Sequence, residues 1–259
     1  MSGQRRPAAY QVEAVRHILI TRYNISFRPA ARAGVDALSA DWLDYRDRLF
    51  KAYCVPSVEA QENRDFEWLV LFHPQTPARY YEFLGGIATV VLASDLRSAK
   101  KKISRRRFFR RPTLTTRLDN DDCIAIDFTA KIRAAAEKAV SNKFGHSTDF
   151  VVVPPVGAHM DIATKRWQLR ESKSPPFISI FEGTRMFRRW RTPLEFNHTT
   201  ILEYYPFVMV EDEKPVWMRM LHDRNLSTRK PDPQPDRDLG ELLDRFPALR
   251  ALVPKSGGA

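Results

Sequence analysis

The feature that most constrains this chain is an alternation of short apolar runs and amphipathic segments along residues 17–155. The apolar run His17–Ile20 ends in a polar cluster, which is typical of a buried strand followed by a loop. Next comes a predicted helix that Ser39 caps and Pro56 closes. Further strands are predicted over 66–72, 87–93, 113–118 and 150–153, with helices over 76–86 and 127–145. This alternation predicts an α/β fold with a mostly parallel sheet flanked by helices.

The chain changes its pattern beyond about residue 156. Short strand-like pieces at 177–181 and 201–210, with many prolines, replace the long helical periodicities. With 259 residues, 43% of them hydrophobic, the chain can bury one large core. We therefore expect a single domain over 1–228 with two halves, about 13–155 and 156–228. A linker and a short amphipathic helix, Leu239–Leu252, are expected in the remainder, 229–259.

The positive charge of the chain is concentrated in one segment. Nine of the basic residues, and no acid, lie between Arg97 and Arg111, so a net charge of +11 falls to 11 − 9 = +2 outside it. One interpretation is a mobile flap over an anionic ligand or a contact with an anionic membrane surface. The other is an ordinary solvated loop. Binding of nucleic acid or another anionic polymer through 97–111 is an alternative, but a protein of that kind usually carries a wholly basic face.

The sequence also bears on location and redox chemistry. No apolar run approaches the length of a membrane span, and the first residues, Met1–Pro7, are polar. We expect a cytoplasmic protein that could touch the inner face of the membrane. Cys54 and Cys123 have no CxxC spacing and are expected to be buried filler.

An acidic turn, Asp119-Asn120-Asp121-Asp122, follows the predicted strand 113–118. Three carboxylates within four residues repel one another unless a cation or basic partners compensate them, and Mg²⁺ or Mn²⁺ does this well. A plain surface turn is the alternative, but ligands gather at the carboxyl ends of strands in such folds. His222 could complete a metal shell or be a structural residue.

Several blocks of the sequence resemble one known family. They are 20–24, 49–50 with 54–57 and Gln61, 66–72 with 76–77, 116–122, 176–182 and 217–225, of which Arg117-Leu118-Asp119-Asn120-Asp121-Asp122 is the most specific. His73 departs from the pattern, because that family usually has an acid after the second strand. In these blocks the chain is similar to the putative rhamnosyl transferase family of bacteria, which belongs among the GT-A-like glycosyltransferases. The resemblance implies a Rossmann-like GT-A domain with a nucleotide-sugar half, 13–155, and an acceptor half, 156–228.

The resemblance also implies roles for individual residues. Asp121 and His222 would bind the metal, and Asp119 would face the metal or the ribose. Asp122 would lie against sugar or acceptor. The nucleotide would be contacted by a further set, Thr21, Arg22, Asn24 and Arg117. An inverting transfer needs a carboxylate base near the acceptor hydroxyl, and Glu182, at the end of a predicted strand, is our candidate.

The expected function is therefore a metal-dependent hexosyl transfer. A sugar, with rhamnose suggested by the family name alone, would pass from a nucleoside-diphosphate donor to a glycan or lipid-linked acceptor, with Mn²⁺ or Mg²⁺ as cofactor. Two other classes remain open besides binding of nucleic acid. They are a metal-dependent phosphoryl-transfer enzyme and a GT-A-like domain that only binds.

Overall fold

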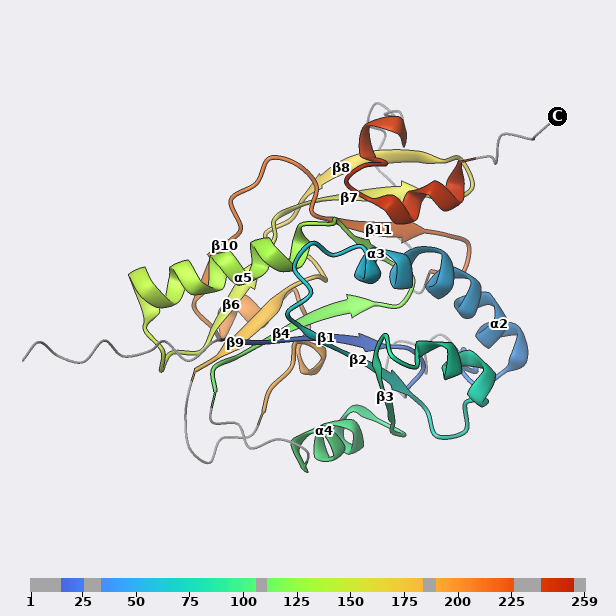
Figure 1. The fold of residues 1–259 in the computed structure, drawn as a ribbon, viewed down its shortest axis with the longest axis horizontal. Coiled ribbons are helices and arrows are strands. Elements are labelled where there is room, and N and C mark those ends of the chain that lie inside the picture. Colours follow the sequence, from blue (N-terminus) through green and yellow to red (C-terminus); the bar gives the residue numbers. More distant parts are fainter. Residues whose placement is uncertain (1–14, 26–33, 106–110, 184–189, 226–238, 254–259) are drawn as a thin grey trace, which may run out of the picture.

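The computed structural model describes residues 15–25, 34–105, 111–183, 190–225 and 239–253, which form two sheets and their flanking helices (Figure 1). The larger sheet has seven described strands: β1 (Arg16–Arg22), β2 (Glu67–Phe72), β3 (Thr89–Leu92), β4 (Thr113–Asp119), β6 (Phe150–Val153), β9 (Ser179–Glu182) and β10 (Phe207–Met209). Their order is β10-β6-β9-β4-β1-β2-β3. Each neighbouring pair is parallel except the two that include β9. The expected mixed, mostly parallel sheet is confirmed.

Helices cover both faces of this sheet. Helices α2 (Ala40–Leu49), α3 (Val55–Glu59) and α5 (Phe128–Ala139) lie on one side, and α4 (Leu96–Arg105) lies on the other (Figure 1). In β1, Leu19 packs toward α5 while its neighbours Ile18 and Ile20 pack toward α4. A strand covered on both faces must be apolar at every position, and this explains the continuous run in β1.

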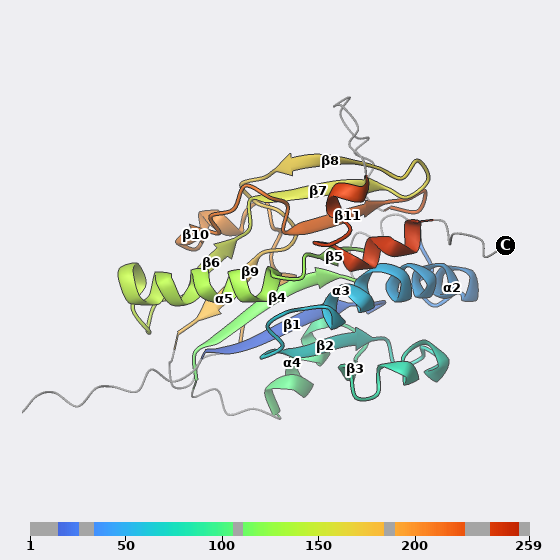
Figure 2. The ribbon, with the colours of Figure 1, turned by 45° about the horizontal axis from the view of Figure 1, so that its top comes forward.

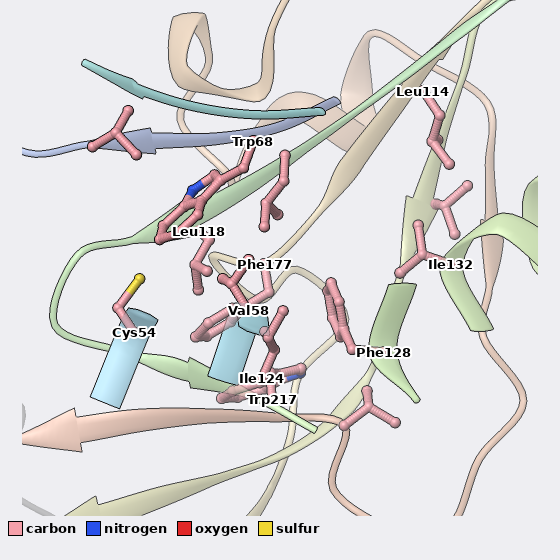
Figure 3. Close-up of a cluster of buried hydrophobic side chains, with 14 of the residues drawn as sticks. Cys54, Val58, Trp68, Leu114, Leu118, Ile124, Phe128, Ile132, Phe177 and Trp217 are labelled. Atoms are coloured by element: carbon pink, nitrogen blue, oxygen red, sulfur yellow. The ribbon is translucent and has the colours of Figure 1, made fainter. Parts of the chain in front are cut away.

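The main core lies between the larger sheet and α2, α3 and α5. Figure 3 shows Trp68 and Leu118 from the sheet in one buried apolar cluster with Phe177 and Phe128. All of these residues are almost fully buried. Burial of apolar surface on this scale is the main force that holds the helices on the sheet.

A second sheet lies above α3 and contains four described strands (Figure 2). They are β5 (Cys123–Ile124), β11 (Trp217–Leu221), β7 (Val156–Asp161) and β8 (Arg166–Glu171), in that order. β5 follows the acidic turn directly and pairs with β11, so that Met218 lies opposite Cys123. The second sheet therefore brings a late part of the chain against the end of β4.

Gly157 allows β11 to take this place. A Cβ atom at Gly157 would lie 2.0 Å from Cε2 of Trp217, inside van der Waals contact, so only glycine lets the indole lie on β7. The Trp217 ring stacks on Phe177 and its Nε1 donates to the carbonyl of Pro154 at 2.8 Å. Sequence patterns did not predict the β7–β8 hairpin.

Two predicted element boundaries are wrong. The helix expected to close at Pro56 continues through a π-helical segment, Phe50–Cys54, into α3. Pro56 lies in the first turn of α3, where the N–H that proline lacks is not needed. The segment 76–86 forms two 3-10 turns in place of one helix.

The basic segment is also different from the expectation, because 96–105 is helix α4 and not a loop. Leu96, Ala99 and Ile103 recur at helical spacing and pack under the larger sheet. Lys100 is buried in this interface and pairs with Glu195. Residues 106–110, the middle of the expected flap, lie outside the described residues.

The carboxyl-terminal helix predicted over 239–252 is two 3-10 segments, Leu239–Leu242 and Pro247–Leu252. Phe246 and Leu249 are fully buried in a cluster that includes Met218 and Met220 of β11. This tail therefore packs on the second sheet. Among the described residues, no helix combines the length and the apolar character that crossing a membrane requires.

Candidate functional site

The acidic turn lies at the carboxyl end of β4, as expected from the sequence. Asp119 is the last residue of β4 and is the register partner of Arg22, the last residue of β1. Parallel strands end at the same edge of a sheet, so both side chains reach the same place. Helix α2 stands beside this edge (Figures 1 and 2).

Asp119 is held by an arginine of its own strand. Arg117 donates from Nε at 3.1 Å and from Nη2 at 2.6 Å to the two oxygens of Asp119. The two residues are two positions apart in β4, and therefore project on the same side of the sheet. Burial raises the pKa of Asp119, but Arg117 and Arg22 outweigh burial and hold that pKa below its usual range. The carboxylate is thus ionised and fixed in direction.

Asp121 is paired with an arginine from α2. Arg46 donates from Nη1 to Oδ2 of Asp121 at 2.6 Å, and its Nη2 bonds to Oδ1 of Asn120. Both side chains of the Arg46–Asp121 pair are 12% exposed. Sequence reasoning missed Arg46. A signal was present, because position 46 continues the buried stripe of Leu43 and Phe50, where a charged residue needs a partner.

His222, the residue after β11, reaches the same carboxylate. Its Nε2 lies 3.1 Å from Oδ2 of Asp121, although 101 residues separate the two in sequence. The Nε2 atom also lies 3.1 Å from Nδ2 of Asn225, and Nδ1 accepts the backbone N–H of Arg224 at 3.3 Å. Burial raises the pKa of Asp121, but Arg46 and His222 together hold it well below its usual range.

The turn that carries His222 is fastened to α2. Tyr45 donates its hydroxyl to Oδ1 of Asp223 at 2.5 Å, and Arg224 pairs with Asp41 at 2.7 Å. The ring of Tyr45 lies 5.4 Å from the ring of His222, and the guanidinium of Arg224 lies 4.5 Å from the Tyr45 ring. We call these contacts the α2 latch. They hold the imidazole at the sheet edge.

Asp122 faces inward. It is 4% exposed, and its Oδ1 accepts the backbone N–H of Met220 in β11 at 2.9 Å. Burial raises its pKa well above the usual range, and the charges of Asp121 and Asp119 add to this effect. This bond ties Asp122 to β11, the strand that precedes His222. The contact with sugar or acceptor that the resemblance implies stays a prediction.

Two of the residues expected beside the nucleotide have structural contacts. The Thr21 hydroxyl is buried and accepts the indole N–H of Trp68 at 3.0 Å. Asn24 donates to Oγ1 of Thr76 at 2.8 Å and accepts the backbone N–H of His73 at 2.9 Å. The first bond joins β1 to β2, and the bonds of Asn24 tie together the loops that follow these strands.

Arg22 and Arg117, the other two residues expected beside the nucleotide, lie near Asp119. Burial lowers the pKa of Arg22 to about 10, and the charge of Asp119 offsets part of this effect. A guanidinium that is buried beside other arginines favours an anionic ligand. This property fits the expected donor diphosphate.

Glu182 is not part of this cluster. It is the last residue of β9, which runs antiparallel to β4, and it lies opposite Thr113 at the start of β4. The seven residues of β4, Thr113–Asp119, span about 20 Å. Glu182 therefore lies at the opposite edge of the sheet from the acidic turn, because β9 runs in the reverse direction, and its role as the base stays a prediction. Glu182 accepts the backbone N–H of Arg191 at 2.9 Å.

The fit of a divalent cation can be judged from these atoms. Within the described part of the chain, no three His, Cys, Asp or Glu side chains form a group that could hold a metal alone. Two do converge, because ligands placed about 2.1 Å from one cation and at right angles are about 3 Å apart, close to the distance between Asp121 and His222. Mg²⁺ and Mn²⁺ commonly take one or two protein ligands and complete the shell with phosphate and water. The pair therefore fits such a cation.

Comparison with known proteins gives a family match. Residues 28–234, more than half of the chain, match the model of the family described as putative rhamnosyl transferase. No curated protein matches the chain in sequence. One of the solved structures that resemble it is the crystal structure of S. aureus TarS 1-349, with a TM-score of 0.43 and 10% identity. That alignment covers 80% of this chain and 60% of the TarS chain, so this chain spans less than two thirds of it.

Proposed function

This chain belongs to the putative rhamnosyl transferase family, and we propose that it transfers a sugar from a nucleoside-diphosphate donor with a divalent cation at Asp121 and His222. The acceptor is a glycan or a lipid-linked glycan, and rhamnose is the donor sugar that the family name suggests. The family supports the reaction class. The charged side chains at the sheet edge support the position that we propose for the donor.

One observation carries the proposal: His222 and Asp121 meet at 3.1 Å across 101 residues of sequence. The contact depends on three separate features of the fold. They are the pairing of β5 with β11, the Asp122–Met220 bond and the α2 latch. A carboxylate and an imidazole brought together in this way offer a cation one oxygen and one nitrogen ligand, a combination that suits Mn²⁺ better than Mg²⁺.

The arginines around the pair supply the rest of the electrostatics. When bound, the cation would neutralise the negative charge that develops on the diphosphate leaving group. Arg22 and Arg117 lie at the same edge, at the ends of β1 and β4, and give the diphosphate further positive charge. Asp119, fixed by Arg117, is then oriented to accept a hydrogen bond from a ribose hydroxyl.

Thermal shift with a matrix of ligands tests this function. The protein is heated with uridine, guanosine or thymidine diphosphate, each with Mn²⁺, with Mg²⁺ and with EDTA. We expect one diphosphate to raise Tm with Mn²⁺ and to have little effect with EDTA, because a ligand that binds only the folded state stabilises it. An equal rise with EDTA would assign the anion to the arginines alone and remove the cation. The absence of a rise with every diphosphate would remove the donor site.

A further inference from the structure

Arg46 has contacts that a purely structural ion pair does not explain. We propose that Arg46 is an internal cation that occupies Asp121 until the donor arrives and then moves from Asp121 to the donor diphosphate. This inference rests on the proposed function and adds a residue that the sequence blocks of the family resemblance do not contain. It makes the diphosphate a requirement for tight binding of the cation.

The first argument is competition for one atom. Nη1 of Arg46 and Nε2 of His222 approach the same oxygen, Oδ2 of Asp121, at 2.6 and 3.1 Å. A divalent cation held by Asp121 and His222 would share this oxygen with a guanidinium. Two positive charges on one carboxylate oxygen repel each other strongly in a buried place. Cation and guanidinium are thus alternative partners of Asp121.

The second argument is the charge of the whole cluster. Four arginines, at 22, 46, 117 and 219, face three aspartates, at 119, 121 and 122, which gives a formal charge of 4 − 3 = +1. With all three carboxylates ionised, a divalent cation raises this formal charge to +3, and the cluster has no further anion to balance it. A diphosphate brings at least two negative charges. The anion therefore favours the cation, and the cation favours the anion, by the same factor.

The third argument is that Arg46 can leave its place while its neighbour Arg117 is fixed. Arg117 binds both oxygens of Asp119 from within a strand. The Nε of Arg46 is buried and has no hydrogen-bond partner among the described residues. A guanidinium with an unused donor, at the end of a long side chain on α2, gains a bond when it turns to a phosphate. The Trp42 ring, 5.5 Å from the guanidinium carbon, provides an apolar surface for that movement.

The test measures binding of Mn²⁺ and of pyrophosphate separately. Free Mn²⁺ is followed by electron paramagnetic resonance as protein is added, first without any anion. We expect Arg46→Gln to bind Mn²⁺ alone about 5- to 10-fold more tightly than the wild type, because its competitor is gone. With premixed Mn²⁺ and pyrophosphate, calorimetry should show Arg46→Gln binding about 5- to 10-fold more weakly. The opposite signs are the signature of the proposal.

Arg48→Gln is the matched control, since Arg48 lies on the same helix, is exposed and stacks on Tyr45. It should leave both affinities unchanged. Arg46→Lys keeps the positive charge but loses the planar guanidinium with its paired N–H donors. It should bind Mn²⁺ alone as weakly as the wild type does, and it should bind pyrophosphate more weakly than the wild type. Circular dichroism confirms that each variant is folded.

Two results separate the possible failures. If Asp121→Asn binds Mn²⁺ as well as the wild type does, the cation site itself is misplaced and the proposed function fails. If Asp121→Asn loses Mn²⁺ while Arg46→Gln binds it equally or more weakly than the wild type, the cation site stands and the exchange by Arg46 is overturned.

Discussion

Carboxylates with opposite pKa shifts lie beside the two ends of β4, Asp119 and Asp121 at one end and Glu182 of the neighbouring β9 at the other. At the carboxyl end, arginines hold the pKa values of Asp119 and Asp121 below the usual range in spite of burial. At the other end, burial raises the pKa of Glu182 to about 8. Two basic side chains also lie at this end, but each of them contacts a residue other than Glu182. Lys100 pairs with Glu195, and the guanidinium of Arg191 donates to the Tyr205 hydroxyl at 2.8 Å.

This difference shows that the position of a carboxylate at a strand end does not decide its chemistry. Arginine and imidazole neighbours, Arg46 and His222, hold the pKa of Asp121 below its usual range. Glu182 holds a proton at neutral pH and accepts a backbone N–H. The carboxyl end of β4 is where we propose that a cation binds together with an anion.

The largest expected effect is therefore on ligand binding at one end alone. Asp121→Asn should weaken binding of Mn²⁺ with a nucleoside diphosphate by on the order of 100-fold or more, because it removes the carboxylate that anchors the cation. Glu182→Gln should leave this affinity within about twofold of the wild type. Calorimetry on the two variants measures both. A loss of comparable size in Glu182→Gln would show that the two ends act together and would end the comparison.

The sequence predicted the carboxyl end of β4 well, since its signals are local. The run 113–118 is β-branched, and the acidic turn follows it directly, so strand and turn could be located without tertiary information. The pairing of His222 with Asp121 came from the family resemblance, and the structure brings the two side chains together. Their role in binding a metal stays a prediction.

The remaining features depend on contacts between distant segments. The direction of β9 is set by its neighbours in the sheet, and the apolar run 177–181 does not specify it. Asn24 resembles a ligand-binding residue in sequence, but the loop after β2 supplies Thr76 and His73 to bind it. Arg46 could be recognised only as a charge in a buried helical stripe. Its partner, 75 residues away, is not visible in such a pattern.

The second prediction uses stability to sharpen the contrast. The folded protein keeps the proton of Glu182 up to about pH 8, whereas the unfolded chain loses it near its usual pKa of about 4.3. Between these values the folded state binds more protons, so the free energy of unfolding falls as pH rises. Glu182→Gln has no such proton. Relative to the wild type, it should gain on the order of 2 kcal/mol between pH 5 and pH 9.

Urea unfolding at several pH values measures this gain. The exposed Glu203 is the matched control, and Glu203→Gln should show no gain with pH. The estimate lies below the roughly 5 kcal/mol that the full pKa difference represents, because solvent reaches part of the Glu182 side chain. Parallel curves for Glu182→Gln and the wild type would mean that Glu182 is ionised at neutral pH, as Asp119 and Asp121 are, and that the two ends do not differ in this respect.

The smallest expected effect concerns the α2 latch. Tyr45→Phe removes the hydroxyl that donates to Asp223 but keeps the ring beside His222 and Arg224. The contact is on the surface, so Tm should stay within about 2 °C of the wild type. The turn that carries His222 becomes less ordered, and the affinity for Mn²⁺ with diphosphate should fall about two- to threefold.

Tyr205→Phe is the matched control, because it deletes the same group beside Arg191, at the opposite end of β4. It should not change that affinity. If Tyr45→Phe binds Mn²⁺ as tightly as Tyr205→Phe does, His222 is held by Asp121, Asn225 and β11 alone, and the latch has no part in positioning it.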